Sequence, residues 1–334
     1  MFEFDVVPGK SVTEILRTSA EHVLAIVRQT YIGHEKKETI NPDSYFLRFP
    51  DRPEVRIIAL PAYVGGTVDR AGIKWVSSFP KNIAQGAPRA SAVLILNSPE
   101  TGHPIACLEA AGISAARTAA SAAVATVALA RPDDDRRIAF VGAGVIAREI
   151  VDYLVHAGVT ASTITCHDLD PVSAASLADH ARASFGVPAA VTDSLAQALE
   201  HDIVVFATTA SAPYVDPATH LRPDQLLLNV SLRDLPPQLL LRCNNIVDDV
   251  EHCLKADTSP HLAERLSGAR DFITGTIGGA LLGQVRLDED RPTIVSPFGL
   301  GVLDIAVGHF VLTAAQVSGT AVGIPDFFGT TRRW

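Results

Sequence analysis

The stretch Arg136–Asp170, RRIAFVGAGVIAREIVDYLVHAGVTASTITCHDLD, determines the fold expected for this chain. Within it, Ile138–Val141 is a short apolar run of the kind that forms a buried strand. The next six residues, Gly142-Ala143-Gly144-Val145-Ile146-Ala147, match the G-x-G-x-x-A turn that joins a strand to a helix in dinucleotide-binding domains. A second strand, Thr163–His167, ends at Asp168. This order predicts a βαβ unit of the Rossmann type.

Each position of the turn has a physical role in binding a dinucleotide. Gly142 permits the tight turn, and Gly144 lets the backbone approach a pyrophosphate. Val145 and Ile146 open a helix whose positive end favours phosphate. The Asp168 carboxylate would accept hydrogen bonds from a ribose diol and repel a 2′-phosphate, which favours NAD over NADP. The alternative is an ordinary βαβ unit with a glycine turn and no cofactor.

Composition bounds the class of protein. The chain has 334 residues, of which 47% are hydrophobic and 19% charged, as expected for one large or two medium globular domains. Its net charge of −9, without a basic cluster, argues against nucleic acid as the main partner. The four cysteines form no C-x-x-C pair, and no signal-type segment opens the chain, so we expect a reduced cytoplasmic protein without structural zinc.

The first 130 residues mix helical and strand patterns. Val12–Gln29 has helical apolar spacing with Ser11 as a possible N-cap, and Ala110–Ala130 reads as an alanine-rich helix packed inside the protein rather than a membrane span. The predicted strands are Ser44–Phe49, Val55–Leu60, Ala71–Ser77, Ser91–Asn97 and Pro104–Glu109. This region therefore reads as an α+β domain, with Ala62–Arg70 as a connection.

From Arg136 onward, strands and helices alternate, which predicts a doubly wound parallel sheet with helices on both faces. Ligand groups in such sheets come from the loops after the strands. Those loops nominate five residues: Thr208, Thr209, Ser211, Asp234 and Asp248.

Three further side chains could carry chemistry. Lys74 lies within an apolar strand, and its alternative role is an exposed residue of an edge strand. Arg117 lies on a helix of small residues, where it needs an anionic partner, and a structural ion pair would serve equally. Asp234 follows a strand end, and its alternative role is to cap a helix.

Together these segments resemble the ornithine cyclodeaminase/mu-crystallin family over nearly the whole chain. The matching motifs are Ala71-Gly72-Ile73-Lys74, Ser114-Ala115-Ala116-Arg117-Thr118-Ala119-Ala120, the glycine turn, Asp234, and Ser296-Pro297-Phe298-Gly299 followed by Asp304. The resemblance implies a substrate-binding and dimerisation domain made from both ends of the chain, residues 1–130 and 305–334. A Rossmann NAD-binding domain, residues 131–304, is inserted in it, and the protein is expected to be a homodimer.

The resemblance also implies roles for individual residues. Lys74 and Asp234 would move protons, and Arg48 and Arg117 would bind the carboxylate of an amino-acid substrate, since guanidinium groups bind carboxylates in bidentate fashion. Tyr45 and Ser77 are expected to line the substrate. The expected contacts to NAD come from Gly142, Gly144, Val145, Ile146, Asp168, Thr208, Thr209, Ser211, Ser231 and Thr118. No metal is expected.

The sequence departs from ornithine cyclodeaminase itself, because the strand Arg56–Pro61 lacks the glutamate of that enzyme. The segments 41–50, 74–80 and 248–252 instead resemble one branch of the family, the N-(2-amino-2-carboxyethyl)-L-glutamate dehydrogenases of 2,3-diaminopropionate biosynthesis, known from siderophore and peptide antibiotic pathways. That branch predicts NAD-dependent oxidative cleavage to 2-oxoglutarate and L-2,3-diaminopropionate. The alternatives are an ornithine or lysine cyclodeaminase, an alanine dehydrogenase, a ketimine reductase, or a crystallin-like cofactor-binding protein without turnover.

Overall fold

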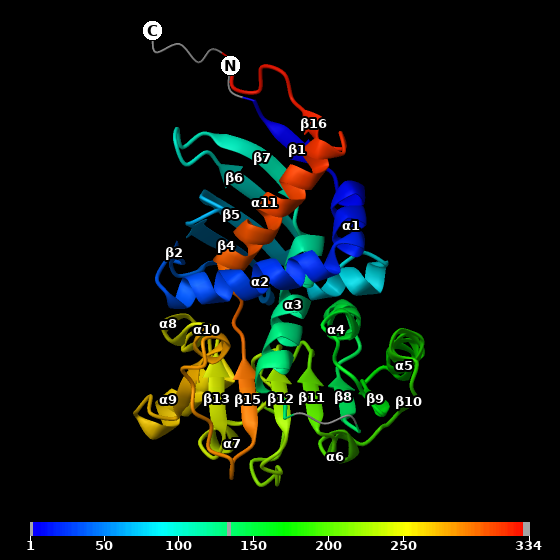
Figure 1. Ribbon diagram of the computed structural model, residues 1–334. Helices are drawn as coiled ribbons and strands as arrows, with labels where there is room; N and C mark the ends of the chain where they lie inside the picture. The colour runs from blue at the N-terminus through cyan, green and yellow to red at the C-terminus, as the bar shows by residue number, and fades with distance from the viewer. Residues whose placement is uncertain (1–2, 132–134, 330–334) are drawn as a thin grey trace. The chain divides into compact units, whose positions relative to one another are not determined.

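The chain forms two compact units (Figure 1). The structure, a computed structural model, describes residues 3–131 and 135–329. One unit combines the residues up to Arg117 with those from Leu300 onward, and the other is the segment Thr118–Gly299. The expected domain boundaries, 130/131 and 304/305, lie later in the chain. They differ because the first unit boundary falls inside an unbroken helix and the second falls before the last helix rather than within it.

The first unit is built on a mixed sheet. Among the described residues its strands follow the order β16-β1-β7-β6-β5-β4-β2, and β3 also pairs with β4. Its elements are β1 (Asp5–Val7), α1 (Gly9–Thr18), α2 (Ala20–Glu35), β2 (Thr39–Ile40), β3 (Tyr45–Phe49), β4 (Arg52–Val64), β5 (Arg70–Ser78), the 3₁₀ helix η1 (Pro80–Gln85), β6 (Ala90–Asn97), β7 (Pro104–Glu109), α11 (Gly301–Val317) and β16 (Val322–Gly323). The helix α3 (Ala111–Leu129) begins in this unit and continues into the second.

The last helix, α11, packs against β4, β5 and β6 of this sheet. Two glycines allow the close approach. A Cβ atom at Gly308 would lie 2.0 Å from a methyl carbon of Leu94, and one at Gly72 would lie 2.3 Å from the carbonyl oxygen of Ile95 and 2.8 Å from Ile305 of α11. The packing therefore ties the C-terminal part of the chain to its N-terminal sheet.

The second unit is a parallel sheet with the strand order β10-β9-β8-β11-β12-β15-β13-β14. Its elements are β8 (Arg137–Val141), α4 (Val145–His156), β9 (Thr163–His167), α5 (Pro171–Phe185), β10 (Ala189–Val191), α6 (Leu195–Ala198), β11 (Ile203–Phe206), β12 (Leu226–Asn229), α7 (Pro237–Leu240), β13 (Asn244–Val247), α8 (Val250–Cys253), α9 (Ser259–Ser267), β14 (Ile273–Thr276), α10 (Ile277–Leu281) and β15 (Thr293–Ser296). The strand order reverses between β8 and β11, which is the switch point where such sheets bind ligands. The predicted fold class, a Rossmann-type sheet combined with an α+β part, is confirmed.

Two local predictions in the first unit are wrong. The segment predicted as one helix, Val12–Gln29, is two helices that meet at Ser19, and α1 begins at Gly9 after Pro8 rather than after Ser11. Pro8 fixes the backbone angle before the first turn, so the helix begins before the polar residue that resembled a cap. The predicted connection Ala62–Arg70 is also shorter, because β4 continues to Val64 in register with β5.

Among the described residues, α3 is the helix long and apolar enough to cross a membrane. Most of it is buried inside the protein, as expected for a core helix of this composition.

Candidate functional site

The glycine turn after β8 has the backbone that its sequence requires. Gly142 has a φ of 94°, and a Cβ atom there would lie 2.6 Å from the carbonyl oxygen of Ala207. Only glycine fits both restrictions. Gly144 differs, because its φ is −81° and an added Cβ would meet nothing within 4 Å. Since the protein itself leaves that space open, the glycine suits close approach of a ligand to the backbone.

The helix α4 begins directly after Gly144, and no side chain caps its N-terminus. The first N–H groups of a helix have no partner within the helix, and its dipole places partial positive charge there. Val145 and Ile146 therefore offer N–H groups to an anion such as a pyrophosphate, as predicted from the sequence.

Asp168 follows β9 and contacts the glycine turn. Its Oδ2 accepts a hydrogen bond of 2.7 Å from the backbone N–H of Ala143, and its Oδ1 accepts one of 2.8 Å from that of Asp170. Asp170 instead caps α5, accepting from the N–H groups of Val172 and Ser173. Asp168 is thus the half-buried carboxylate held beside the turn, where its remaining lone pairs can accept from a ribose diol.

Asp234 is completely buried and accepts three hydroxyl groups. Thr208 Oγ1 donates to its Oδ1 at 2.5 Å, and Tyr214 Oη donates to the same oxygen at 2.8 Å. The Ser231 hydroxyl donates to Oδ2. These residues come from the loops after β11 and β12, so the structure brings together three of the predicted residues and adds Tyr214, which the sequence did not single out.

The loop that carries Asp234 is strained. Leu232 has a φ of 72°, a conformation that is uncommon for a residue with a branched side chain. The N–H of Ser231 donates to the Phe206 carbonyl at 3.0 Å, and the Leu232 carbonyl accepts from Ser259 at 2.7 Å. The helix-capping alternative for Asp234 is wrong, because α7 begins after Pro236 without a side-chain cap. Such strain is often found at functional sites.

The first unit holds a second cluster of buried charges around Lys74. The side chain of Lys74 is 1% exposed, so the exposed-edge alternative is wrong. Its Nζ lies 2.7 Å from Asp304 Oδ2 and donates to Ser114 Oγ at 3.0 Å. Burial, helped by the charge of Arg117, lowers the pKa of Lys74 to about 8, although the Asp304 carboxylate opposes the shift.

Arg117 shares the same carboxylate. Its Nε donates to Asp304 Oδ1 at 3.1 Å, and its Nη2 donates to Ser114 Oγ at 3.5 Å. The structural ion pair considered as the alternative for Arg117 is therefore present, but in a cluster where two cations share Asp304. In the sequence Asp304 appears as an acid between Leu303 and Ile305 in the last helix, and this apolar context was the signal for a buried charge.

Three of the predicted substrate contacts lie elsewhere on the sheet. Tyr45 and Ser77 occupy register positions on the face opposite Lys74, because side chains alternate between the two faces of a strand. Tyr45 is 68% exposed, and the Ser77 hydroxyl bonds to Ser91. Arg48 lies on the face of Lys74, opposite Arg56 in the register, and is exposed.

The other predicted residues have less specific surroundings. Thr209 and Ser211 are exposed in the loop after β11, and Thr118 is half-buried on α3. Asp248 is buried, and its carboxylate accepts from the backbone N–H of Gly299 at 2.6 Å. Burial raises the pKa of Asp248. Its contact gives it a structural role in the loop before α11.

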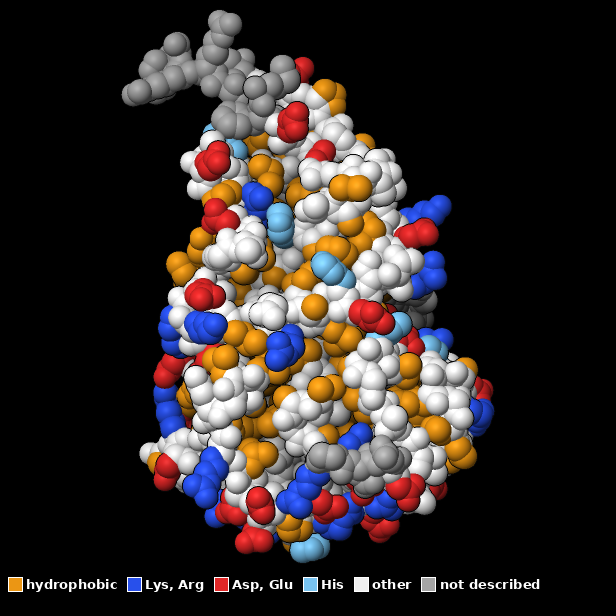
Figure 2. All heavy atoms as spheres, in the orientation of Figure 1, with side chains coloured by type: hydrophobic (Ala, Val, Ile, Leu, Met, Phe, Trp, Pro, Cys, Tyr) orange, Lys and Arg blue, Asp and Glu red, His pale blue; other side chains and the backbone are white. Residues whose placement is uncertain are grey.

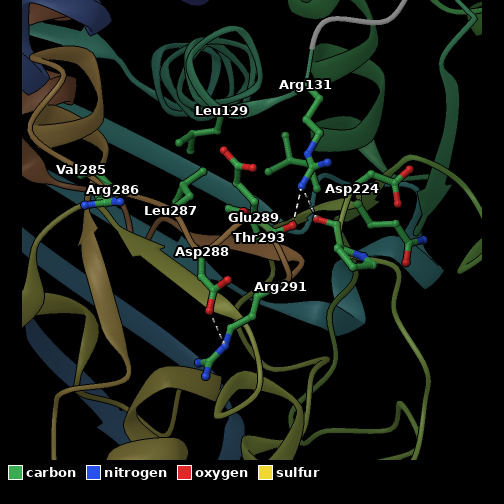
Figure 3. A pocket seen from close by; sticks show the side chains of 13 residues that line it. Leu129, Arg131, Asp224, Val285, Arg286, Leu287, Asp288, Glu289, Arg291 and Thr293 are labelled. Atoms are coloured by element: carbon green, nitrogen blue, oxygen red, sulfur yellow. Dashed lines mark hydrogen bonds and ion pairs between the residues drawn. The ribbon is translucent and has the colours of Figure 1, made fainter.

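A pocket of about 370 Å³ lies at the other end of the parallel sheet, around the first residues of β12 and β15 (Figure 3). Its charged groups already have partners: Arg131 donates to the Glu289 carbonyl at 2.7 Å, and Arg291 pairs with Asp288 at 3.1 Å. Figure 2 shows basic and acidic side chains mixed over this end of the unit. The pocket contains none of the predicted site residues, so we do not assign the chemistry to it.

A family model described as the ornithine cyclodeaminase/mu-crystallin family matches residues 12–316. The family inferred from the sequence is thereby confirmed. Among characterised proteins, the chain is 26% identical over 294 residues to the N-((2S)-2-amino-2-carboxyethyl)-L-glutamate dehydrogenase of Staphylococcus aureus, covering 85% of this chain and 87% of that protein.

Two solved structures share the fold. One is a Δ1-pyrroline-2-carboxylate reductase of Thermococcus litoralis in complex with NADH and L-proline, with a TM-score of 0.87, 22% identity, and coverage of 96% of this chain and 100% of that chain. The other is an archaeal alanine dehydrogenase dimer with bound NAD, with a TM-score of 0.86, 24% identity, and coverage of 98% and 100%.

The two glycines of the turn should respond differently to the same substitution. Gly142→Ala places a Cβ against Ala207 in an unfavourable backbone conformation, and we expect it to lower the free energy of unfolding by about 2 kcal/mol or more. Gly144→Ala should change it by less than about 0.5 kcal/mol but weaken binding of a dinucleotide. Urea unfolding and NADH fluorescence titration measure the two effects. Equal destabilisation by both substitutions would contradict the assignment.

Proposed function

Since the chain belongs to the ornithine cyclodeaminase/mu-crystallin family, we propose that it is an NAD-dependent dehydrogenase acting on a secondary amine. The substrate we infer is N-(2-amino-2-carboxyethyl)-L-glutamate, and the products are 2-oxoglutarate and L-2,3-diaminopropionate. Support comes from the similarity to the Staphylococcus aureus enzyme and from the local sequences that resemble this branch. The reaction would supply 2,3-diaminopropionate in the cytoplasm for a siderophore or peptide natural product.

The observation that carries the proposal is the buried cluster of Lys74, Arg117 and Asp304. Two cations share one carboxylate in it, with distances of 2.7 and 3.1 Å to the two oxygens of Asp304. A further carboxylate, that of an amino acid, is the ligand such a cluster attracts, because a buried guanidinium forms strong hydrogen bonds with carboxylates. Asp304 keeps both side chains in place before the substrate binds.

The residues of the second unit fit NAD. Gly144 leaves open space beside the backbone, α4 offers uncapped N–H groups, and Asp168 is held beside the turn. When bound, NAD⁺ would supply the hydride acceptor. The carboxylate of Asp168 favours a free ribose diol over a 2′-phosphate, and hence NAD over NADP.

The chemistry balances as one oxidation and one hydrolysis. The glutamyl Cα loses a hydride and the adjacent nitrogen loses a proton, which gives an imine. Water then adds to the imine carbon, and the C–N bond breaks to release the ketone and the primary amine. Lys74, in its neutral form, is the proposed acceptor of the proton from the amine and then from water. Asp234 orients the polar groups of the reaction through its hydroxyl partners.

A substrate panel tests the function. Purified protein is incubated with NAD⁺ and, separately, with the aminocarboxyethyl-glutamate adduct, L-alanine, L-ornithine and L-lysine, and NADH absorbance is recorded with product analysis by mass spectrometry. We expect the adduct to have a kcat/KM at least about tenfold above the others, the discrimination that one charged contact supplies. Proline and ammonia from L-ornithine without net NADH would indicate a cyclodeaminase instead, and preference for L-alanine would indicate an alanine dehydrogenase.

The pH dependence tests the role of Lys74. Because the pKa of Lys74 is lowered to about 8 and the neutral amine is the proposed base, kcat/KM should rise with pH and level off above about 8. Asp304→Asn removes the carboxylate that favours the charged amine, so the inflection should move to lower pH. Lys74→Met should abolish it. An inflection that persists in Lys74→Met would assign it to another group.

We also propose that two copies of the chain associate through the sheet of the first unit. On the face opposite Lys74, Tyr45, Trp75 and Val93 stand near one another in the register of β3, β4, β5 and β6. They are 68%, 41% and 39% exposed, and Leu47 beside them is 47% exposed. Contiguous exposed apolar side chains of this kind are typical of protein interfaces, and the commonest soluble oligomer is a two-fold dimer.

Light scattering during size-exclusion chromatography tests this assembly. The wild-type protein should have the mass of a dimer, and the double substitution Trp75→Glu with Val93→Glu should yield monomers, because like charges would meet on an apolar interface. The control is Val317→Glu at the end of α11, where the side chain is 85% exposed. A wild-type monomer, or a dimer unchanged by the double substitution, would refute the interface.

A further inference from the structure

The face of the sheet that carries Lys74 continues beyond the start of α11. Along β5, Lys74, Val76 and Ser78 point to this same face, because alternate residues of a strand share a face. Four residues of strand separate Lys74 from Ser78, which is about 13 Å at the usual rise per residue. A row of polar residues crosses the sheet at Ser78, with Arg56 and Arg48 opposite one another in the next two strands.

Arg89 joins this row from the start of the hairpin arm that leads into β6. Its Nη1 donates to Ser78 Oγ at 3.3 Å, which is its one side-chain hydrogen bond among the described residues. The side chain is half-buried, and burial lowers the pKa of its guanidinium with no carboxylate to offset the effect. A guanidinium has five N–H donors, so most of the donors of Arg89 have no protein acceptor.

The neighbouring acid is engaged elsewhere. Glu54 pairs with Lys81 at 3.3 Å, and the Lys81 side chain is 83% exposed. Arg48 and Arg56 face each other across the antiparallel pair, an arrangement of like charges that is unfavourable without an anion nearby. This end of the face is therefore an environment that attracts a negative group.

The backbone holds Arg89 in a fixed place. The N–H of Phe79 donates to the Arg89 carbonyl at 2.8 Å, and the segment between these residues contains the 3₁₀ helix η1. Residue Ala90, next in sequence, pairs with Ser78 in the sheet. Arg89 is thus attached to the same strand as Lys74 through a rigid hairpin, and a partly desolvated guanidinium is positioned before any ligand binds.

We propose that Arg89, together with the Ser78 hydroxyl, binds a second carboxylate of the substrate, distal to the carboxylate held by Lys74 and Arg117. The inference rests on the proposed function and specifies its substrate class: the site selects amino acids with a distal acidic group over monocarboxylic ones. Long side chains at both ends shorten the 13 Å separation of the backbone positions (about four residues of strand) to the length of such a molecule. Arg89 is a specificity residue and takes no part in proton transfer.

The test compares Arg89→Met with the wild-type enzyme on two substrates, the aminocarboxyethyl-glutamate adduct and its γ-carboxamide analogue. For the acid we expect KM to rise about 10- to 100-fold, the range of a charge-assisted hydrogen bond, with kcat within about twofold, because the distal contact does not change during the reaction. For the amide, KM should change little. Lys81→Met is the matched control, since it removes an exposed positive charge from the same hairpin and should affect neither substrate.

The outcomes separate specificity from structure. Equal losses for acid and amide in Arg89→Met would mean a structural role, and no loss for either would mean no contact; both would overturn the proposal. If the wild-type enzyme turns over neither substrate, the proposed function fails by itself. Arg89 is then judged by calorimetric titration of NADH-loaded protein with L-glutamate and L-glutamine, where only the former should lose affinity in Arg89→Met.

Discussion

The carboxylate of Asp304 is the interaction on which the first unit and its site depend. It joins β5 and the start of α3 to the last helix, through Lys74 and Arg117, and it is completely buried. Removing one partner from such a cluster leaves an uncompensated buried charge, which costs far more than an exposed ion pair contributes. Asp304 therefore ties the C-terminal helix to the sheet and also sets the electrostatic environment of Lys74.

The parallel sheet of the second unit could be predicted because its signals are local. The apolar run before Gly142, the glycine turn and the acid at Asp168 lie within one segment, and each strand of the unit is followed by its own helix. In the first unit, β1 and β16 have three and two residues, too few to form a pattern, and they pair with strands far away in sequence. Their place is determined by tertiary contacts that a window of sequence does not contain.

The candidate site was predictable in its residue types but not in its partners. Lys74, Arg117 and Asp234 stand out as charged residues in apolar segments, whereas Asp304 is 187 positions from Arg117. The sheet adds a second limit. A shift of one residue moves a side chain to the other face, so Ser77 and Ser78 are equivalent in sequence but lie on opposite faces. Register, which sequence alone specifies weakly, decides which of the two can serve the face of Lys74.

The two buried acids have different surroundings, and this difference divides the chemistry between the units. Asp234 accepts hydrogen bonds from Thr208, Tyr214 and Ser231, and a proton added to its carboxylate would force one of these hydroxyls to turn away from its acceptor. Lys74 has a single hydroxyl partner and lies in an apolar strand where its neutral form is favoured. The amine can exchange a proton without breaking a hydrogen-bond network. We therefore regard Lys74 as the group that moves the proton and Asp234 as a fixed acceptor that orients hydroxyl groups.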